Sequence, residues 1–227
     1  AFDNPIRFID PDGMAPGDFL DENGNKIGED GKEDGELYLV TNEIERGIVM
    51  ANHSVGETTQ LNNLTSAIRL PTLSVRQKMG NAVDLSNLPN FSIGDTKGGF
   101  HEEGGSYGIS EGKQIAIPAK PGQANMTGKI GTKANVNTTH PADESSVPRD
   151  YQISGTYHVH PKGTFSNNTG FAQEPSESDY RAAKHTAVKG NGYHYVLGAR
   201  SGTVYIYNST GQKATFPLIE FRSIGNE

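Results

Sequence analysis

The sequence contains no cysteine, which excludes disulfide bonds, thiol nucleophiles and thiolate metal sites. Any metal ion must therefore bind to histidine and carboxylate side chains. The sequence also lacks an apolar run of about 18 residues, so we expect no membrane-spanning helix. Its first residues lack the basic, apolar and small-residue regions of a signal peptide. We therefore expect export to depend on another device.

Apolar side chains are scarce, at 33% of the chain, whereas glycine (28 residues) and proline (12 residues) are frequent. This composition predicts a compact core with extensive loops. The 227 residues are enough to bury such a core without disulfide or metal staples. The net charge of −7 gives no general attraction to nucleic acid and favours a protein or peptide target.

The N-terminal part of the chain changes from polar to apolar. Residues 15–36 are almost entirely polar, which predicts a linker. The apolar run at residues 37–40 predicts a short strand. Ser54 and Glu57 have capping-box spacing ahead of apolar residues on one helical face. We therefore expect a helix over residues 54–69.

The remaining chain has the pattern of an α+β domain, which we expect to span residues 37–227 with its core at about 91–227. Helices are expected at 73–83 and 176–188, and strands at 113–117, 153–160, 193–197 and 203–207, with a hairpin turn at 199–202. Residues 118–150 are rich in Pro, Gly, Asn and Thr, which indicates a long loop insertion. The predicted architecture is a mixed β-sheet flanked by helices, with long loop insertions.

The segment with the clearest chemistry is His158-Val159-His160-Pro161. On a strand, successive side chains alternate between faces, so both imidazoles point the same way while Tyr157 and Val159 enter the core. Residues two apart on a strand are about 6.6 Å apart at the backbone, which lets both rings reach one metal ion. Chance gives roughly 0.01 such His-x-His-Pro strings in a chain of this composition. The tetrapeptide therefore predicts two metal ligands.

A third ligand is expected at the start of the helix that follows. Ser176 and Asp179 have the spacing of a capping box, which many helix N-termini share. A helix N-terminus also holds an anionic ligand well, so a cap and a metal ligand are compatible. We therefore interpret Asp179 as both.

His-x-His-Pro followed by Ser-x-x-Asp, with a glutamate upstream, resembles the signature of JAMM (JAB-like) metalloproteases over roughly residues 98–207. In that family two histidines and the aspartate bind Zn²⁺, the serine stabilises the oxyanion and the glutamate acts as the base. The resemblance implies zinc ligands at His158, His160 and Asp179, and the oxyanion role for Ser176. An open fourth position is also what distinguishes catalytic from structural zinc.

Two points of this resemblance stay open. The Glu-x-x-Gly spacing of the family favours Glu102 as the base, although Glu103 also lies between glycines. The loop over residues 162–175 is longer than in the family, so the reserve ligands are Glu174 and Glu177.

The other histidines are not expected to bind the metal ion. We expect surface or hydrogen-bonded positions for His53, His140 and His194, and a structural role for His185. We expect the side chain of His101 to point to the opposite face from that of Glu102.

The N-terminal string Asn4-Pro5-Ile6-Arg7-Phe8-Ile9-Asp10-Pro11-Asp12-Gly13-Met14 resembles the motif that closes the core domain of Rhs repeat-associated proteins. In that family the core is a β-cage, and cleavage after the motif frees a variable C-terminal toxin. The resemblance implies that residues 1–14 end the cage, that cleavage falls between Met14 and Ala15, and that the rest is the released effector.

The resemblances together imply a secreted antibacterial effector that enters a target cell, by type VI secretion, and hydrolyses a peptide or isopeptide bond in a protein there. The implied partners are the Rhs cage, the protein substrate and a cognate immunity protein. No nucleic-acid partner is expected. Two alternatives stay open, a metal-dependent nuclease toxin and a zinc-stabilised binding toxin without catalysis.

Overall fold

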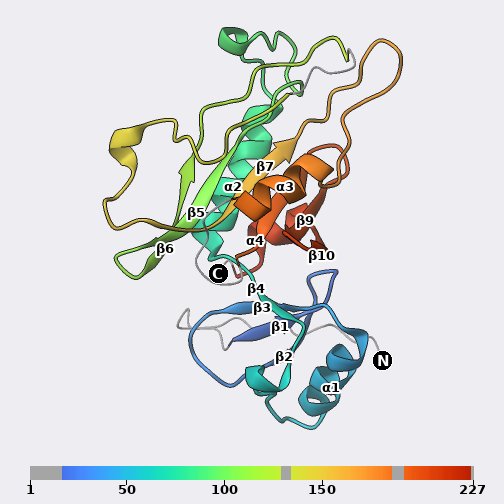
Figure 1. The fold of residues 1–227 in the computed structure, drawn as a ribbon. Helices are drawn as coiled ribbons and strands as arrows, with labels where there is room; N and C mark the ends of the chain where they lie inside the picture. Colours follow the sequence, from blue (N-terminus) through green and yellow to red (C-terminus); the bar gives the residue numbers. More distant parts are fainter. Residues whose placement is uncertain (1–16, 129–133, 186–191, 226–227) are drawn as a thin grey trace. The chain divides into compact units, whose positions relative to one another are not determined.

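The computed structural model describes residues 17–128, 134–185 and 192–225, and these contain two compact units. One unit takes in the chain up to Leu70 together with the last residues from Ser223, and the other spans Pro71–Arg222. Each unit has its own mixed sheet, and helices accompany both (Figure 1). The predicted α+β class is confirmed.

The smaller unit is built on a four-stranded sheet of order β2-β1-β3-β4. Its strands are β1 (Asp18–Leu20), β2 (Lys26–Glu29), β3 (Leu37–Val40) and β4 (Ala67–Arg69). The expectation of a linker over residues 15–36 is therefore wrong from Gly17 onward. Phe19 and Ile27 are buried there, packed with Val49 in one apolar cluster. Two short strands are stable in so polar a segment because β3 supplies the apolar partner.

The helix of this unit lies earlier than the pattern of leucines predicts. Helix α1 spans Glu43–Ser54, and the Asn42 side chain caps it by accepting the backbone N–H groups of its first turn. The expected helix over residues 54–69 is wrong. That stretch contains the short 3₁₀ helix η1 (Leu61–Asn63) and strand β4, because Ile68 is buried by pairing with β3 rather than on a helical face.

The larger unit contains a six-stranded sheet of order β10-β9-β8-β7-β5-β6. Its strands are β5 (Gly104–Ser110), β6 (Lys113–Pro118), β7 (Gln152–His160), β8 (His194–Gly198), β9 (Thr203–Asn208) and β10 (Gly211–Pro217). Only β7 and β8 pair in parallel, and the other neighbours are antiparallel. Four of these strands match the predicted ones, whereas β5 and β10 were not predicted.

Helices cover both faces of this sheet. Its helices are α2 (Leu73–Ser86), α3 (Glu177–His185) and α4 (Leu218–Ser223), with the 3₁₀ turns η2 (Phe91–Ile93) and η3 (Glu144–Ser146). Val196 packs against α3, whereas its neighbour Tyr195 contacts Phe221 of α4. Neighbouring strand residues point to opposite faces, so α3 and α4 lie on different sides of the sheet. The α3 face is the one that carries the two histidines.

Candidate metal centre

Strand β7 presents His158 and His160 on one face, as the alternation predicts. Both histidines are buried. Tyr157, which precedes them, and Val159, which lies between them, point to the other face and are at most 1% exposed. The neighbouring strand β5 comes very close here, because Gly104 pairs with His158 and a Cβ at Gly104 would lie 2.4 Å from the Tyr157 carbonyl oxygen. Only glycine permits this approach, which keeps the segment before β5 beside the histidines.

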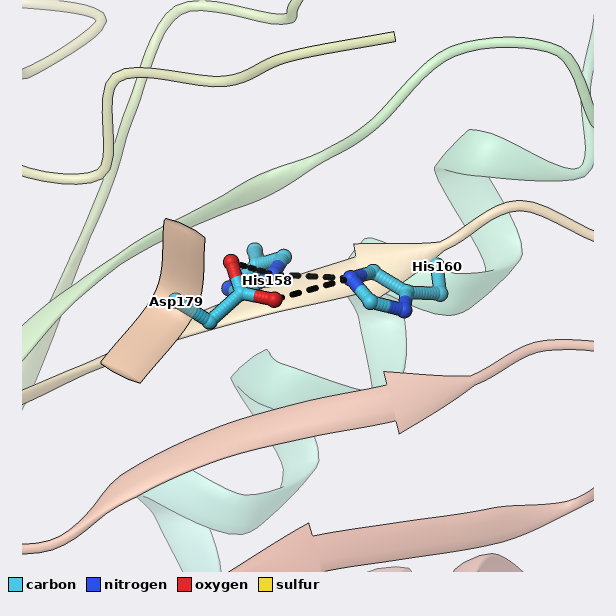
Figure 2. Close-up of side chains that lie close together, drawn as sticks. All are labelled: His158, His160 and Asp179. Atoms are coloured by element: carbon cyan, nitrogen blue, oxygen red, sulfur yellow. Dashed lines mark hydrogen bonds and ion pairs between the residues drawn. The ribbon is translucent and has the colours of Figure 1, made fainter. Parts of the chain in front are cut away.

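Asp179 completes the cluster from the first turn of α3. Its Oδ1 lies 3.2 Å from His158 Nε2 and its Oδ2 lies 3.6 Å from His160 Nε2. The two Nε2 atoms are 3.1 Å apart. Figure 2 shows the carboxylate facing both rings, with each oxygen aimed at a different ring. The three residues that the sequence predicts as ligands therefore converge, and they could hold a metal ion.

The spacing of these donor atoms fits a small tetrahedral ion. Ligand atoms about 2.0–2.1 Å from a tetrahedral ion are about 3.3–3.4 Å from one another. The distances of 3.1 Å between the two Nε2 atoms and 3.2 Å from Oδ1 to His158 Nε2 are slightly shorter than that value, and the 3.6 Å to His160 Nε2 is measured from the other carboxylate oxygen, Oδ2. Within the part of the chain that the structure describes, these three residues are the group that could hold a metal ion, and three protein ligands leave one position of a tetrahedral site for another ligand.

Burial and charge act differently on the three groups. Burial alone would lower the pKa of His158, but the carboxylates of Asp179 and Glu102 outweigh it and raise that pKa. At His160 burial prevails and lowers the pKa. Burial would raise the pKa of Asp179, yet hydrogen bonds with both histidines and with Ser176 hold it well below its usual range. The site thus presents an ionised carboxylate and a neutral imidazole, the states that bind metal ions.

Ser176 supports the carboxylate of Asp179 directly. Its backbone N–H and its hydroxyl donate to Asp179 Oδ2 at 2.6 and 2.7 Å. The same hydroxyl lies 2.7 Å from Ser178 Oγ. One of the two bonds of the predicted capping box is present, from the Ser176 N–H to the Asp179 carboxylate, whereas the Asp179 N–H donates to the Ser176 carbonyl oxygen instead of to its hydroxyl. The oxyanion role implied for Ser176 by the resemblance stays a prediction.

We expect Ser176→Ala to weaken metal binding by about 10- to 100-fold, the usual effect of removing a partner that orients a ligand. Competition with a chromophoric chelator measures this. Ser166→Ala, in the exposed part of the preceding loop, serves as the matched control. Equal affinities of the Ser176 and Ser166 variants would show that the carboxylate needs no support from the hydroxyl.

The long loop over residues 162–175 folds on itself. Thr164 and Gly170 form an isolated bridge, and the rings of Phe165 and Phe171 are 4.9 Å apart. Gln173 ties the loop down, donating to the carbonyl of Pro161 and accepting from the N–H of Arg200. The extra residues therefore form a compact loop whose end lies next to the end of β7. Helix α3 can then begin close to β7 and place Asp179 beside the histidines. The reserve ligands Glu174 and Glu177 are exposed and lie outside the cluster.

The two candidate bases, Glu102 and Glu103, have different surroundings in the structure. Glu102 lines a cleft of about 690 Å³ together with His158 and Asp179, and its Oε2 accepts the Val136 N–H at 3.1 Å. Glu103 is buried, and its Oε1 lies 3.2 Å from His101 Nε2. Only Glu102 therefore faces the space next to the metal cluster. His101 is fully buried and does not line this cleft. Strand β5 begins only at Gly104, so the opposite face expected for His101 stays a prediction.

Behind the site, His101 joins two carboxylates in a fully buried network. Its Nδ1 lies 2.7 Å from Asp95 Oδ2 and its Nε2 lies 3.2 Å from Glu103 Oε1. Asp95 also accepts the backbone N–H groups of Lys97, Gly98 and Phe100. The network thus fixes the glycine-rich turn that leads to Glu102. Burial alone would lower the pKa of His101, but Glu103 and Asp95 outweigh it and raise that pKa.

This raised pKa predicts a pH-dependent contribution to stability. A folded state that holds the proton more tightly gains stability below the unfolded pKa of 6.5 and loses it as the pH rises through the folded value. We expect His101→Gln to lower the free energy of unfolding by about 1.5–3 kcal/mol near pH 6, and by less near pH 9. Urea unfolding of both proteins at each pH measures the difference. A difference that does not change with pH would contradict a protonated His101.

The cleft brings together parts of the chain that are distant in sequence. The residues lining it are Glu102, Asn135, Val136, Asn137, Thr138, Thr139, Ile153, Thr156, His158, Ser178, Asp179, Ala182, His185 and Tyr207. The predicted insertion thus forms part of the lining through residues 135–139. His185, expected to be structural, is exposed and lines the cleft. Tyr207 was not predicted, because alternation on β9 puts it on one face without showing which face carries the site.

The other predicted histidine positions agree with the structure. His53 and His140 are exposed. His194 is buried and its Nδ1 lies 2.8 Å from Thr156 Oγ1. Burial, with a smaller effect of the His158 charge, lowers the pKa of His194 to about 4. His194 is therefore a neutral, hydrogen-bonded residue beside the metal cluster.

No family model matches this chain, and no curated protein or solved structure is significantly similar to it. The Rhs-like motif, with Met14 and Ala15, lies outside the described residues. Of the helices that the structure describes, none has the length and hydrophobicity to cross a membrane. The site geometry is thus the basis for a functional conclusion.

Proposed function

We propose that the chain is a zinc-dependent peptidase or amidase of the JAMM type. The observation that carries this proposal is the convergence of His158, His160 and Asp179 beside a cleft that His158 and Asp179 line together with Glu102. Two imidazoles and one carboxylate are a common catalytic zinc ligand set. When bound there, Zn²⁺ would act as a Lewis acid and lower the pKa of a water molecule toward about 7.

Glu102 is the residue of this chain that moves the proton. Its carboxylate takes a proton from the attacking water and delivers it to the nitrogen of the leaving amine. The water oxygen forms a bond with the carbonyl carbon, the carbon–nitrogen bond breaks, and an acid and an amine result. Glu102 faces the cleft and lies near enough to His158 to raise its pKa, which supports this role.

We further propose that the enzyme is the C-terminal toxin of an Rhs protein, released by cleavage between Met14 and Ala15 and delivered into a target cell. The sequence motif at residues 4–14 supports this route. A producer of such a toxin needs a cognate immunity protein. The substrate is a protein of the target cell.

The test is incubation of zinc-loaded protein with an extract of sensitive bacteria, followed by mass spectrometry of new amino groups. A peptidase produces new N-termini, and an isopeptidase frees lysine amines on proteins that were joined before. Both should vanish with a chelator and return when zinc is restored. Degraded DNA or RNA with unchanged proteins would indicate a nuclease instead. Zinc binding without any cleavage would indicate a binding toxin.

A further inference from the structure

The α3 face of the sheet carries a hydroxyl group whose position suggests a role in the proposed reaction. Tyr207 lies on β9 and is only 2% exposed. Tyr207 is nevertheless one of the residues that line the cleft, together with Glu102, His158 and Asp179. Tyr205, two residues earlier on the same face, does not line that cleft. The two tyrosines share a strand and a core cluster but differ in access to the site.

The ring of Tyr207 is held on two sides. Tyr180 of α3 packs edge-on against it, with ring centroids 5.6 Å apart and planes at 89°. His194 packs against it at 5.5 Å, and His194 is itself fixed by Thr156. Aromatic pairs at these separations favour one ring position, so the ring of Tyr207 is held in place before any substrate binds.

The surroundings keep this hydroxyl protonated. Burial raises the pKa of Tyr207, and the carboxylates of Asp179 and Glu102 raise it further. Both carboxylates act on the phenol because it lies at the same cleft. A phenol that keeps its proton is a hydrogen-bond donor, and a donor is what an oxygen gaining negative charge requires.

The serine expected to supply such a donor is already engaged. The Ser176 hydroxyl donates to Asp179 Oδ2 and lies 2.7 Å from Ser178 Oγ, and Ser176 does not line the cleft. We propose that Tyr207 is a catalytic residue whose hydroxyl donates a hydrogen bond to the substrate carbonyl oxygen as that oxygen gains charge. This inference rests on the proposed peptidase function. The proton stays on Tyr207 throughout, so the step needs no additional acid or base.

The test compares Tyr207→Phe with Tyr205→Phe, which removes a hydroxyl from the same strand and face outside the cleft. Calorimetry measures the affinity of each zinc-loaded protein for acetohydroxamate, a small anion whose two oxygens bind a metal ion. We expect about 10- to 150-fold weaker binding for Tyr207→Phe, the fold-change that corresponds to the 1.5–3 kcal/mol of a hydrogen bond to a charged group, and wild-type binding for Tyr205→Phe. Zinc content should be the same in all three proteins.

Equal acetohydroxamate affinities of Tyr207→Phe and the wild type would overturn the role of Tyr207 and leave the peptidase proposal intact. A wild type that binds neither zinc nor acetohydroxamate would overturn the proposed function itself. Tyr207→Met removes the hydroxyl with a flexible side chain that can repack, and it replaces Tyr207→Phe if that variant does not fold.

Discussion

Replacing His158 with alanine is expected to abolish stoichiometric metal binding. The variant keeps only two of the three converging metal-binding side chains. It removes the His158 Nε2 atom, which lies 3.2 Å from Asp179 Oδ1 and 3.1 Å from His160 Nε2. Loss of a residue that merely orients a ligand costs about 10- to 100-fold in affinity, so loss of a ligand should cost more than about 100-fold. Zinc content after dialysis, measured by mass spectrometry, gives the result directly.

The matched control is His140→Ala, which removes an exposed histidine of the same unit. It should retain one zinc ion per chain and the wild-type melting temperature. Metal binding should also stabilise the wild type against heat but leave His158→Ala unaffected, because a ligand stabilises only the state that binds it. Zinc retained at full stoichiometry and affinity in His158→Ala would refute the metal centre described above.

The second large effect is expected for Glu102→Gln. The amide cannot take a proton from water, so hydrolysis should fall by about 10²- to 10⁴-fold, the range of general acid–base catalysis. Zinc binding should persist, because Glu102 does not belong to the cluster of ligands. Release of new amines from the bacterial extract measures the loss, and zinc content and thermal melting show that the site and fold are intact.

Glu103→Gln is the natural comparison, because it makes the same chemical change one residue away. Glu103 is buried with His101, so this variant should lose stability but, once folded, keep most of its activity. Loss of activity in Glu103→Gln with full activity in Glu102→Gln would reverse the assignment of the base. Full activity in both variants would remove a glutamate base from the mechanism.

Local sequence patterns were sufficient to predict features that depend on a single strand or helix. The alternation of Tyr157, His158, Val159 and His160 predicts two imidazoles on one face, and the structure places them there. The Ser176 and Asp179 spacing predicts a capped helix start, which the hydrogen bonds confirm. Both patterns depend on residues within four positions of each other, so the rest of the chain hardly affects them.

Patterns failed where apolar residues had more than one possible partner. The leucines and isoleucine after residue 54 fit a helical face, yet Ile68 is buried in β4 by pairing with β3. The polar residues 17–36 resemble a linker, yet Phe19 and Ile27 find an apolar cluster to join. Such choices depend on long-range burial, which outweighs local helix or coil preference.

By itself the sequence was sufficient to name the candidate ligands, the two histidines from strand alternation, which is a local property of the backbone, and Asp179 from the resemblance to the JAMM signature. Only the tertiary structure decided which glutamate lines the cleft beside these ligands and which other groups surround them. Pairing of β5 with β7 turns Glu102 into the cleft and Glu103 away from it, and the order of strands in the sheet brings Tyr207, more than one hundred residues after Glu102, to the same cleft. Those contacts exist only once strands distant in sequence have paired.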